Sequence, residues 1–375
     1  MSAVPKLDTV QWEVTRRCDQ RCEMCCLGGP QSGIGELTTA ECLLLIDQFA
    51  ALEVREVQVF GGEAYLRPDF PLILRRLTRA GIRIALTSGG RRFPTELLED
   101  EEIRPAISHV LLSLDGLEAT HDSLRGTAGS FNAALRTMHG LLRNRIPVGV
   151  TTQINRRNLR ELPTLADFLG RLGIVFWHAQ LTEPFGNARS RLDDLLQPSE
   201  LLNALDVLVR VKRSARRQRM LVKPGNNIGY NGPRSNALRA DLTGHEAYTA
   251  CRQGLSYLAI QPDGTVKGCA SCAAGTDAVR HSIRERPLAA IWNDGKSFVW
   301  TRQWSPDQLW GFCAECTYAP VCRGGCVQTS QALFGRPGNN PYCEHRVLQL
   351  AARGISESLE LAPEPSAACP LALTK

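Results

Sequence analysis

Short apolar runs alternate with helical patterns along the first half of the chain. The apolar runs lie at residues 10–14, 57–60, 82–86, 110–114, 148–154 and 174–179. Segments whose apolar side chains recur every three or four positions lie between them, at 38–52, 69–80, 131–143 and 159–172. A strand and a helix that recur about every 30 residues predict βαβ units around a parallel sheet.

The first helical pattern shows how one face of each helix is expected to pack inward. Thr38 and Glu41 have the spacing of a capping box, which predicts a helix start. Cys42, Leu45 and Phe49 then fall on one face. Six such strand-and-helix repeats are two fewer than a closed eight-fold barrel needs, and in barrel enzymes the chemistry lies at the carboxyl ends of the strands.

The pattern changes after residue 198. Apolar residues between 201 and 209 share one helical face, and a basic run from Arg210 to Arg219 follows. Such a run is most often a solvated helix face, and docking of an acidic peptide is the alternative. Pro-Gly and Gly-Pro pairs near residues 224 and 232 then predict a bridge. We expect a barrel domain at 1–220, a bridge at 221–250, a cysteine-rich domain at 251–350, and a helix end with a flexible tail at 351–375.

Composition narrows the class of protein. The 375 residues are 43% hydrophobic, which allows a large core. The start of the chain lacks the apolar region of a signal peptide, and no run approaches the roughly 18 apolar residues of a membrane span, so we expect a cytoplasmic protein. Its 14 cysteines then indicate metal binding rather than disulfides. The net charge of +6 is too diffuse to indicate a nucleic-acid partner.

Three cysteines follow the first apolar run directly, at Cys18, Cys22 and Cys25. Thiolates at this spacing can bind one [4Fe–4S] cluster and leave its fourth iron without a protein ligand. This CxxxCxxC motif resembles the signature of the radical SAM enzymes. The resemblance implies an α/β fold with a partial (β/α)6 barrel. It also implies that S-adenosylmethionine binds the open iron and is cleaved reductively to a 5′-deoxyadenosyl radical.

Later strand ends carry motifs that resemble the S-adenosylmethionine contacts of this family. Gly61, Gly62 and Glu63 resemble the GGE element, which receives the α-amino group, although glycines are also common in ordinary turns. Met24 stands where the family usually has an aromatic residue and can still pack against adenine. Three further candidate contacts, which could equally be structural or solvated, are Ser88, Ser113 and Arg125.

Seven cysteines in the second half resemble the SPASM domain, which accompanies radical SAM enzymes that modify peptides and proteins. They are Cys251, Cys269, Cys313, Cys316, Cys322, Cys326 and Cys343. By position, the resemblance assigns a distal auxiliary [4Fe–4S] cluster to Cys313, Cys316, Cys322 and Cys343. It assigns a proximal cluster of unspecified type to Cys251, Cys269 and Cys326. A zinc ribbon that uses the CxxC pair is the alternative.

The proximal set lacks a fourth protein ligand. Cys272 can supply it through CxxC spacing and is the ligand we predict. His245 stands where relatives have an extra cysteine, and an open or smaller cluster is the third possibility. The remaining cysteines are predicted to be a loop thiol, a helix-face residue and a tail thiol, at Cys26, Cys42 and Cys369.

The family resemblance extends to peptide maturases and to the enzymes of pyrroloquinoline quinone and mycofactocin biosynthesis. It implies a maturase that forms a crosslink, an oxidation or an excision in a ribosomally made precursor peptide, with auxiliary clusters as electron acceptors. Sulfatase maturases have an aspartate where Ala270 stands, which disfavours formylglycine formation. A small-molecule or protein substrate is one alternative, and a non-enzymatic iron–sulfur or zinc scaffold is another.

The expected partners follow from the same resemblance. The cluster motif starts too close to Met1 for a leader-binding domain to precede it, so we expect the barrel or a separate protein to recognise the peptide. A flavodoxin or ferredoxin-type protein would donate the electron. The sequence names neither the substrate nor the bond formed, and it leaves the oligomeric state open.

Overall fold

All six predicted strands form, and they lie side by side in chain order in one parallel sheet. The computed structural model describes residues 4–31, 35–240, 248–271, 281–362 and 371–374. The six strands are β1 (Thr9–Glu13), β2 (Glu56–Phe60), β3 (Arg83–Ser88), β4 (Ile107–Ser113), β5 (Val148–Ile154) and β6 (Phe176–Leu181). Because the strands are parallel, their carboxyl ends share one edge. The predicted partial barrel is thereby confirmed.

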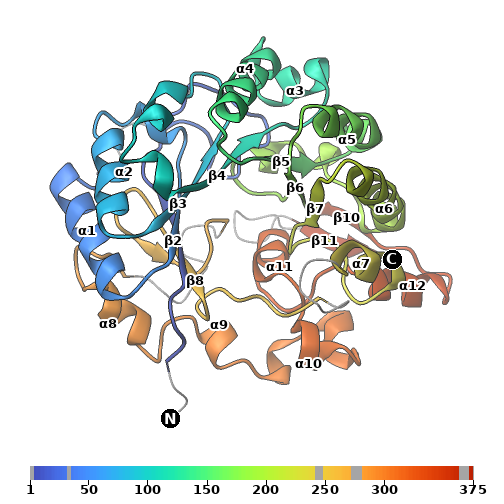
Figure 1. Cartoon of the computed structure of the whole chain (residues 1–375). Helices are drawn as coiled ribbons and strands as arrows, with labels where there is room; N and C mark the ends of the chain where they lie inside the picture. The colour runs from blue at the N-terminus through green and yellow to red at the C-terminus, as the bar shows by residue number, and fades with distance from the viewer. Residues whose placement is uncertain (1–3, 32–34, 241–247, 272–280, 363–370, 375) are drawn as a thin grey trace.

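Six helices cover the outer face of the curved sheet (Figure 1). They are α1 (Thr39–Ala51), α2 (Phe70–Arg79), α3 (Glu118–Leu124), α4 (Ser130–Arg143), α5 (Leu162–Arg171) and α6 (Leu201–Arg217). The predicted capping box starts α1, because the Thr38 side chain accepts from the Glu41 backbone and the Glu41 carboxylate accepts from the Thr38 backbone. The apolar faces of the helices pack on the sheet and form the main core.

Three more strands extend the sheet at both edges. β7 (Leu221–Pro224) pairs with β6, so the boundary predicted at residue 220 falls directly before a barrel strand. β8 (Tyr257–Ile260) returns to pair in parallel with β1, and β9 (Val266–Lys267) pairs with β8. The cysteine-rich half of the chain is therefore joined to the first strand of the barrel.

The C-terminal part lies across the opening between β7 and β8 (Figure 1). Its helices are α7 (Pro233–Arg239), α8 (Leu288–Asn293), α9 (Val299–Arg302), α10 (Ala319–Cys322), α11 (Val327–Phe334) and α12 (Glu344–Ala351). The predicted flexible tail is wrong in part, because β10 (Ser358–Leu361) and β11 (Leu371–Thr374) pair antiparallel. Leu359 and Leu371 are buried, and this burial of apolar surface stabilises the hairpin.

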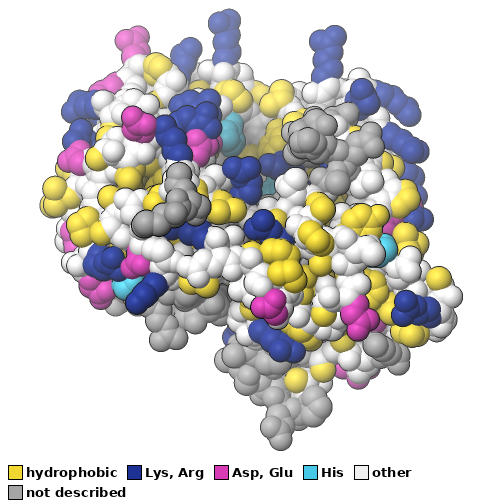
Figure 2. All heavy atoms as spheres, turned by 90° about the horizontal axis from the view of Figure 1, so that it is seen from below, with side chains coloured by type: hydrophobic (Ala, Val, Ile, Leu, Met, Phe, Trp, Pro, Cys, Tyr) yellow, Lys and Arg dark blue, Asp and Glu magenta, His cyan; other side chains and the backbone are white. Residues whose placement is uncertain are grey.

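The basic run on α6 is mostly exposed, as predicted for a solvated face. Arg210, Arg213, Arg217 and Arg219 are accessible, whereas Lys212 is buried and its Nζ donates to two carbonyl oxygens of α7. On the face shown in Figure 2, Lys and Arg side chains are spread widely, with Asp and Glu among them on the left and lower parts of the view. Within the described residues, no helix has both the length and the apolar character needed to cross a membrane.

Candidate active site

The CxxxCxxC segment lies in the loop between β1 and α1, at the carboxyl edge of the sheet. Burial is the main cause that raises the pKa of the Cys18 thiol to about 12 and also raises that of Cys22. The neighbouring Cys22 sulfur also raises the pKa of Cys18, and the neighbouring Cys25 sulfur also raises the pKa of Cys22. A cation bound by all of these thiolates would stabilise their charged forms and so lower their pKa values. These three thiols therefore fit an iron cluster.

The loop after β2 lies against the backbone of this segment. The Gly62 N–H donates to the Thr15 carbonyl at 2.8 Å, and the Glu63 N–H donates to the Arg17 carbonyl at 2.6 Å. A Cβ atom at Gly62 would overlap the Arg17 carbonyl and lie 2.9 Å from Cβ of Cys18. Glycine is therefore required at this position by close approach.

The loop after β6 contacts the other end of the same segment. The Asn187 amide group donates to the Cys22 carbonyl at 2.8 Å, and the Asn187 backbone N–H donates to the Cys25 carbonyl at 2.9 Å. Gly186 has a φ of 51°, and a Cβ atom there would overlap the Cys25 carbonyl. The sequence analysis missed both residues, although a Gly-Asn pair just after a barrel strand was the available signal.

The predicted GGE carboxylate is held at the same edge. Glu63 accepts hydrogen bonds from the Ser88 hydroxyl and from the Gly89 N–H, both at 2.6 Å. Burial is the main cause that raises the pKa of Glu63 to about 7. Ser88 is thus brought to the predicted site, where it orients Glu63.

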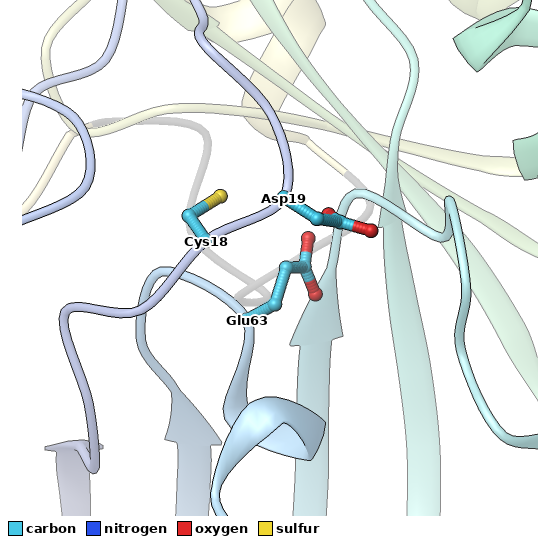
Figure 3. A group of neighbouring side chains, drawn as sticks. All are labelled: Cys18, Asp19 and Glu63. Carbon is cyan, nitrogen blue, oxygen red and sulfur yellow. The ribbon is translucent and has the colours of Figure 1, made fainter.

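A second carboxylate faces Glu63. Figure 3 shows the carboxylates of Asp19 and Glu63 side by side, with Cys18 adjacent. Their ligand atoms lie within 4.8 Å of one another. The Asp19 Oδ1 atom is buried and has no hydrogen-bond partner in the described part of the chain. Two close carboxylates with an unpaired oxygen favour a cationic ligand, and the α-ammonium group of S-adenosylmethionine fits that requirement.

Arg125 directly follows α3, and its side chain reaches the cluster segment. Its Nη1 atom is 3.6 Å from the Cys22 sulfur, and its Nη2 atom is 2.6 Å from an oxygen of Asp115. The Asp115 N–H in turn donates to Nδ1 of His121 at 3.1 Å. Ser113 is buried at the end of β4, two residues before Asp115. The guanidinium thus places a positive charge beside a cluster cysteine.

Met24 is buried rather than open to a ligand. Its side chain is 5% exposed and belongs to a small apolar cluster with Leu124 and Ala188. Only a small part of its surface is available to an adenine ring, so its predicted ligand contact gains no support from the packing.

The four cysteines predicted for the distal cluster come together. The sulfur of Cys343 is affected electrostatically by those of Cys313, Cys316 and Cys322. Burial raises the pKa of the Cys313 thiol to about 11 and that of Cys343 further. Four thiols at one place, three of them buried and Cys316 half-buried, fit a tetrathiolate metal site.

The three cysteines predicted for the proximal cluster line a cavity of about 650 Å³ in the barrel: Cys251, Cys269 and Cys326. The Tyr257 hydroxyl lies 3.7 Å from the Cys251 sulfur. His245 and Cys272, the candidate fourth ligands, lie outside the described residues. Cys369 does as well, whereas Cys42 is buried on the inner face of α1 and Cys26 is an exposed loop thiol, as predicted.

Glu183 lines the same cavity and was not found from the sequence. It lies two residues after the end of β6, and its carboxylate accepts from the Thr329 hydroxyl and interacts with the Asn227 side chain. Burial raises its pKa to about 7. Its negative charge acts on the Cys326 thiol, so it lies on the cluster side of the cavity.

Comparisons with known proteins agree with this geometry. Residues 12–169 match the model of the radical SAM superfamily, and residues 251–317 match that of an iron–sulfur cluster-binding domain, SPASM. An AdoMet-dependent heme synthase of Methanosarcina barkeri is 28% identical over 92% of this chain and 98% of its own. Mycofactocin maturase MftC of Mycobacterium tuberculosis is 26% identical over 88% of this chain and 81% of its own.

Solved structures show the same fold. Streptococcus suis SuiB bound to precursor peptide SuiA has a TM-score of 0.67 at 14% identity, covering 86% of this chain and 72% of that one. Native anSMEcpe with bound AdoMet and Cp18Cys peptide also has a TM-score of 0.67 at 14% identity, covering 89% and 93%. The chain therefore carries a radical SAM domain followed by a C-terminal SPASM domain, and with these it is an S-adenosylmethionine-dependent iron–sulfur enzyme.

Proposed function

We propose that this enzyme oxidatively modifies a ribosomally made peptide that enters the barrel cavity. When bound, the iron–sulfur clusters and S-adenosylmethionine supply one-electron chemistry and a 5′-deoxyadenosyl radical, which is able to attack an unactivated C–H bond. The protein supplies orientation and excludes water. The product is a crosslink, an oxidation or an excision.

The lining of the cavity is the observation that carries this proposal. Seven carboxamide side chains line it: Gln11, Gln58, Gln180, Asn226, Asn227, Gln253 and Gln328. A carboxamide offers both donors and an acceptor, as does each peptide group. A volume of about 650 Å³ lies within the usual range of ligand pockets. Such a wall matches an extended peptide better than a flat apolar molecule.

Residues at the carboxyl edge of the sheet hold the cluster segment and would bind S-adenosylmethionine. The backbones of Gly62 and Asn187 fix the cluster segment, and the carboxylates of Asp19 and Glu63 form a cradle for an ammonium group. On the SPASM side, Glu183 lines the cavity and would accept the proton that a substrate loses on oxidation.

The names of two relatives favour a second candidate substrate, a tetrapyrrole. The AdoMet-dependent heme synthase and an Fe-coproporphyrin III synthase of Methanosarcina barkeri, which is 27% identical over 90% of this chain, both match nearly the whole length. The mycofactocin maturase supports the peptide instead.

One anaerobic experiment separates the two candidates. The reconstituted enzyme is given S-adenosylmethionine and dithionite, which replaces a flavodoxin or ferredoxin donor. Peptides encoded by short reading frames beside the gene are supplied in one set of reactions, and Fe-coproporphyrin III in another. We expect 5′-deoxyadenosine together with a changed peptide mass, and neither with the Cys22→Ala variant. A changed porphyrin with unchanged peptides would contradict the peptide proposal.

We also propose Cys272 as the fourth ligand of the proximal cluster. Its CxxC spacing from Cys269 supports this assignment. Cys272→Ser should lower the iron content and change the spectrum of the proximal cluster, whereas His245→Ala should change neither. Equal iron in the Cys272→Ser variant and the wild type would contradict the assignment.

A further inference from the structure

Lys223 presents a cation to the barrel cavity from β7. On this strand Val222 and Pro224 are buried, whereas Lys223 is accessible and lines the cavity. Its register partner on β6 is His178, which lines the cavity as well. Successive side chains of a strand point to opposite faces, so these two side chains share the inner face.

Among the described residues, no carboxylate acts on Lys223 and no hydrogen bond to its ammonium group is found. Burial is the main cause that lowers its pKa, and the positive charge of Arg239 adds to it. Lys212 differs, because its ammonium group donates to the carbonyls of Ala237 and Leu238 at 3.0 and 2.8 Å. A partly desolvated cation beside a second cation favours an anionic ligand.

Neutral hydrogen-bonding groups surround this cation. Burial lowers the pKa of His178 to about 4, and the charge of Lys223 contributes, so the imidazole is neutral near pH 7 and can donate one N–H. Asn226 and Gln180 line the same cavity from the neighbouring loop and strand. One cation with several neutral donors matches a carboxylate, which accepts through two oxygens.

We infer that Lys223, with His178 and Asn226, forms an anion subsite that binds a carboxylate of the substrate. This inference rests on the proposed entry of the substrate into the cavity and narrows its class to molecules with a carboxylate. A peptide can present one from its C-terminus or from an acidic side chain, and a porphyrin can present one from a propionate.

Binding to the holoenzyme with S-adenosylmethionine tests the subsite through matched probes. N-acetyl-tyrosine is compared with N-acetyl-tyrosinamide for a C-terminus. N-acetyl-glutamate amide is compared with N-acetyl-glutamine amide for a side chain. Fe-coproporphyrin III is compared with its tetra-amide for propionates. In at least one pair the carboxylate form should bind about tenfold more tightly or better, because charge-assisted hydrogen bonds have that strength.

Three variants decide the outcome. Lys223→Met should reduce the preference for the carboxylate to about onefold, Lys223→Arg should keep most of it, and the exposed control Lys296→Met should keep all of it. Iron content and circular dichroism equal to the wild type show that each variant is folded. A wild type without any preference, or a preference that survives in Lys223→Met, overturns the subsite.

Different results would contradict the proposed function and the anion subsite. If Fe-coproporphyrin III binding depends on Lys223 while peptides stay unchanged in turnover, the subsite stands and the peptide proposal fails. If peptides are modified and no probe pair shows a preference for the carboxylate, the peptide proposal stands and the subsite fails.

Discussion

The two well-assembled cysteine sets of this enzyme are held in different ways. The N-terminal segment is fixed by backbone contacts from loops that follow β2 and β6, through Gly62 and Asn187. The distal set comes mostly from one short stretch around α10, and only Cys343 arrives from further along. The first set therefore depends on the barrel as a whole, whereas the second depends on local structure in the C-terminal part.

The largest effect should come from Gly62→Ala. The added methyl group would overlap the Arg17 carbonyl and displace the segment that carries Cys18. We expect iron to fall by about four per chain and 5′-deoxyadenosine formation to be lost, while the distal cluster remains. Iron analysis and electron paramagnetic resonance measure this. Gly295→Ala, where a Cβ atom would meet nothing within 4 Å, is the control. Full iron in Gly62→Ala would contradict the dependence on the barrel.

The second-largest effect should come from a substitution beside the distal cysteines. Arg346 and Glu357 form a buried ion pair at 2.7 Å, and the charge of Arg346 also favours the Cys313 thiolate. Arg346→Met leaves Glu357 buried without its partner and should destabilise the protein by about 3 to 5 kcal/mol.

The thermal midpoint and the spectra of the variant check this prediction. The distal cluster should be lost first on heating, and uncoupled cleavage of S-adenosylmethionine should persist above the temperature at which that cluster is lost. The double variant Arg346→Met with Glu357→Leu should recover part of the stability. Simultaneous loss of both clusters would show that the two sets are not independent.

The smallest effect should come from Asn187→Ala. This change removes one hydrogen bond to the Cys22 carbonyl, a loss of about 0.5 to 1.5 kcal/mol. We expect faster loss of the N-terminal cluster to a chelator, with little change in thermal midpoint. Asn293→Ala, at an exposed position on α8, is the matched control. If the two variants lost the cluster at equal rates, Asn187 would not stabilise the cluster segment.

Much of this fold was predictable because its signals are local. The six apolar runs specify strands whether or not their neighbours are known, and the spacing of Thr38 and Glu41 specifies a helix start. The grouping of the distal cysteines followed from a family resemblance, and the structure brings those four sulfurs together. Short-range patterns of this kind can be recognised in the sequence without knowledge of the tertiary structure.

The missed features depend on tertiary partners. β7 is short and has Lys223 at its centre, so its apolar signal is weak, and pairing with β6 decides its conformation. β11 lies in a Pro- and Ala-rich stretch and forms because Leu371 reaches a buried position. Glu183 is one acidic residue among many until the fold places it in a cavity. Context of this kind overrides local propensity.

The pairing of β8 with β1 has a consequence for synthesis. The strand that precedes the cluster segment emerges first, but residues 257–260, which pair with its second edge, emerge only after most of the barrel. Until then the nascent barrel carries an open strand edge, which is a site for aggregation. The cluster segment therefore follows a strand whose second edge stays unpaired until residue 260 has been made.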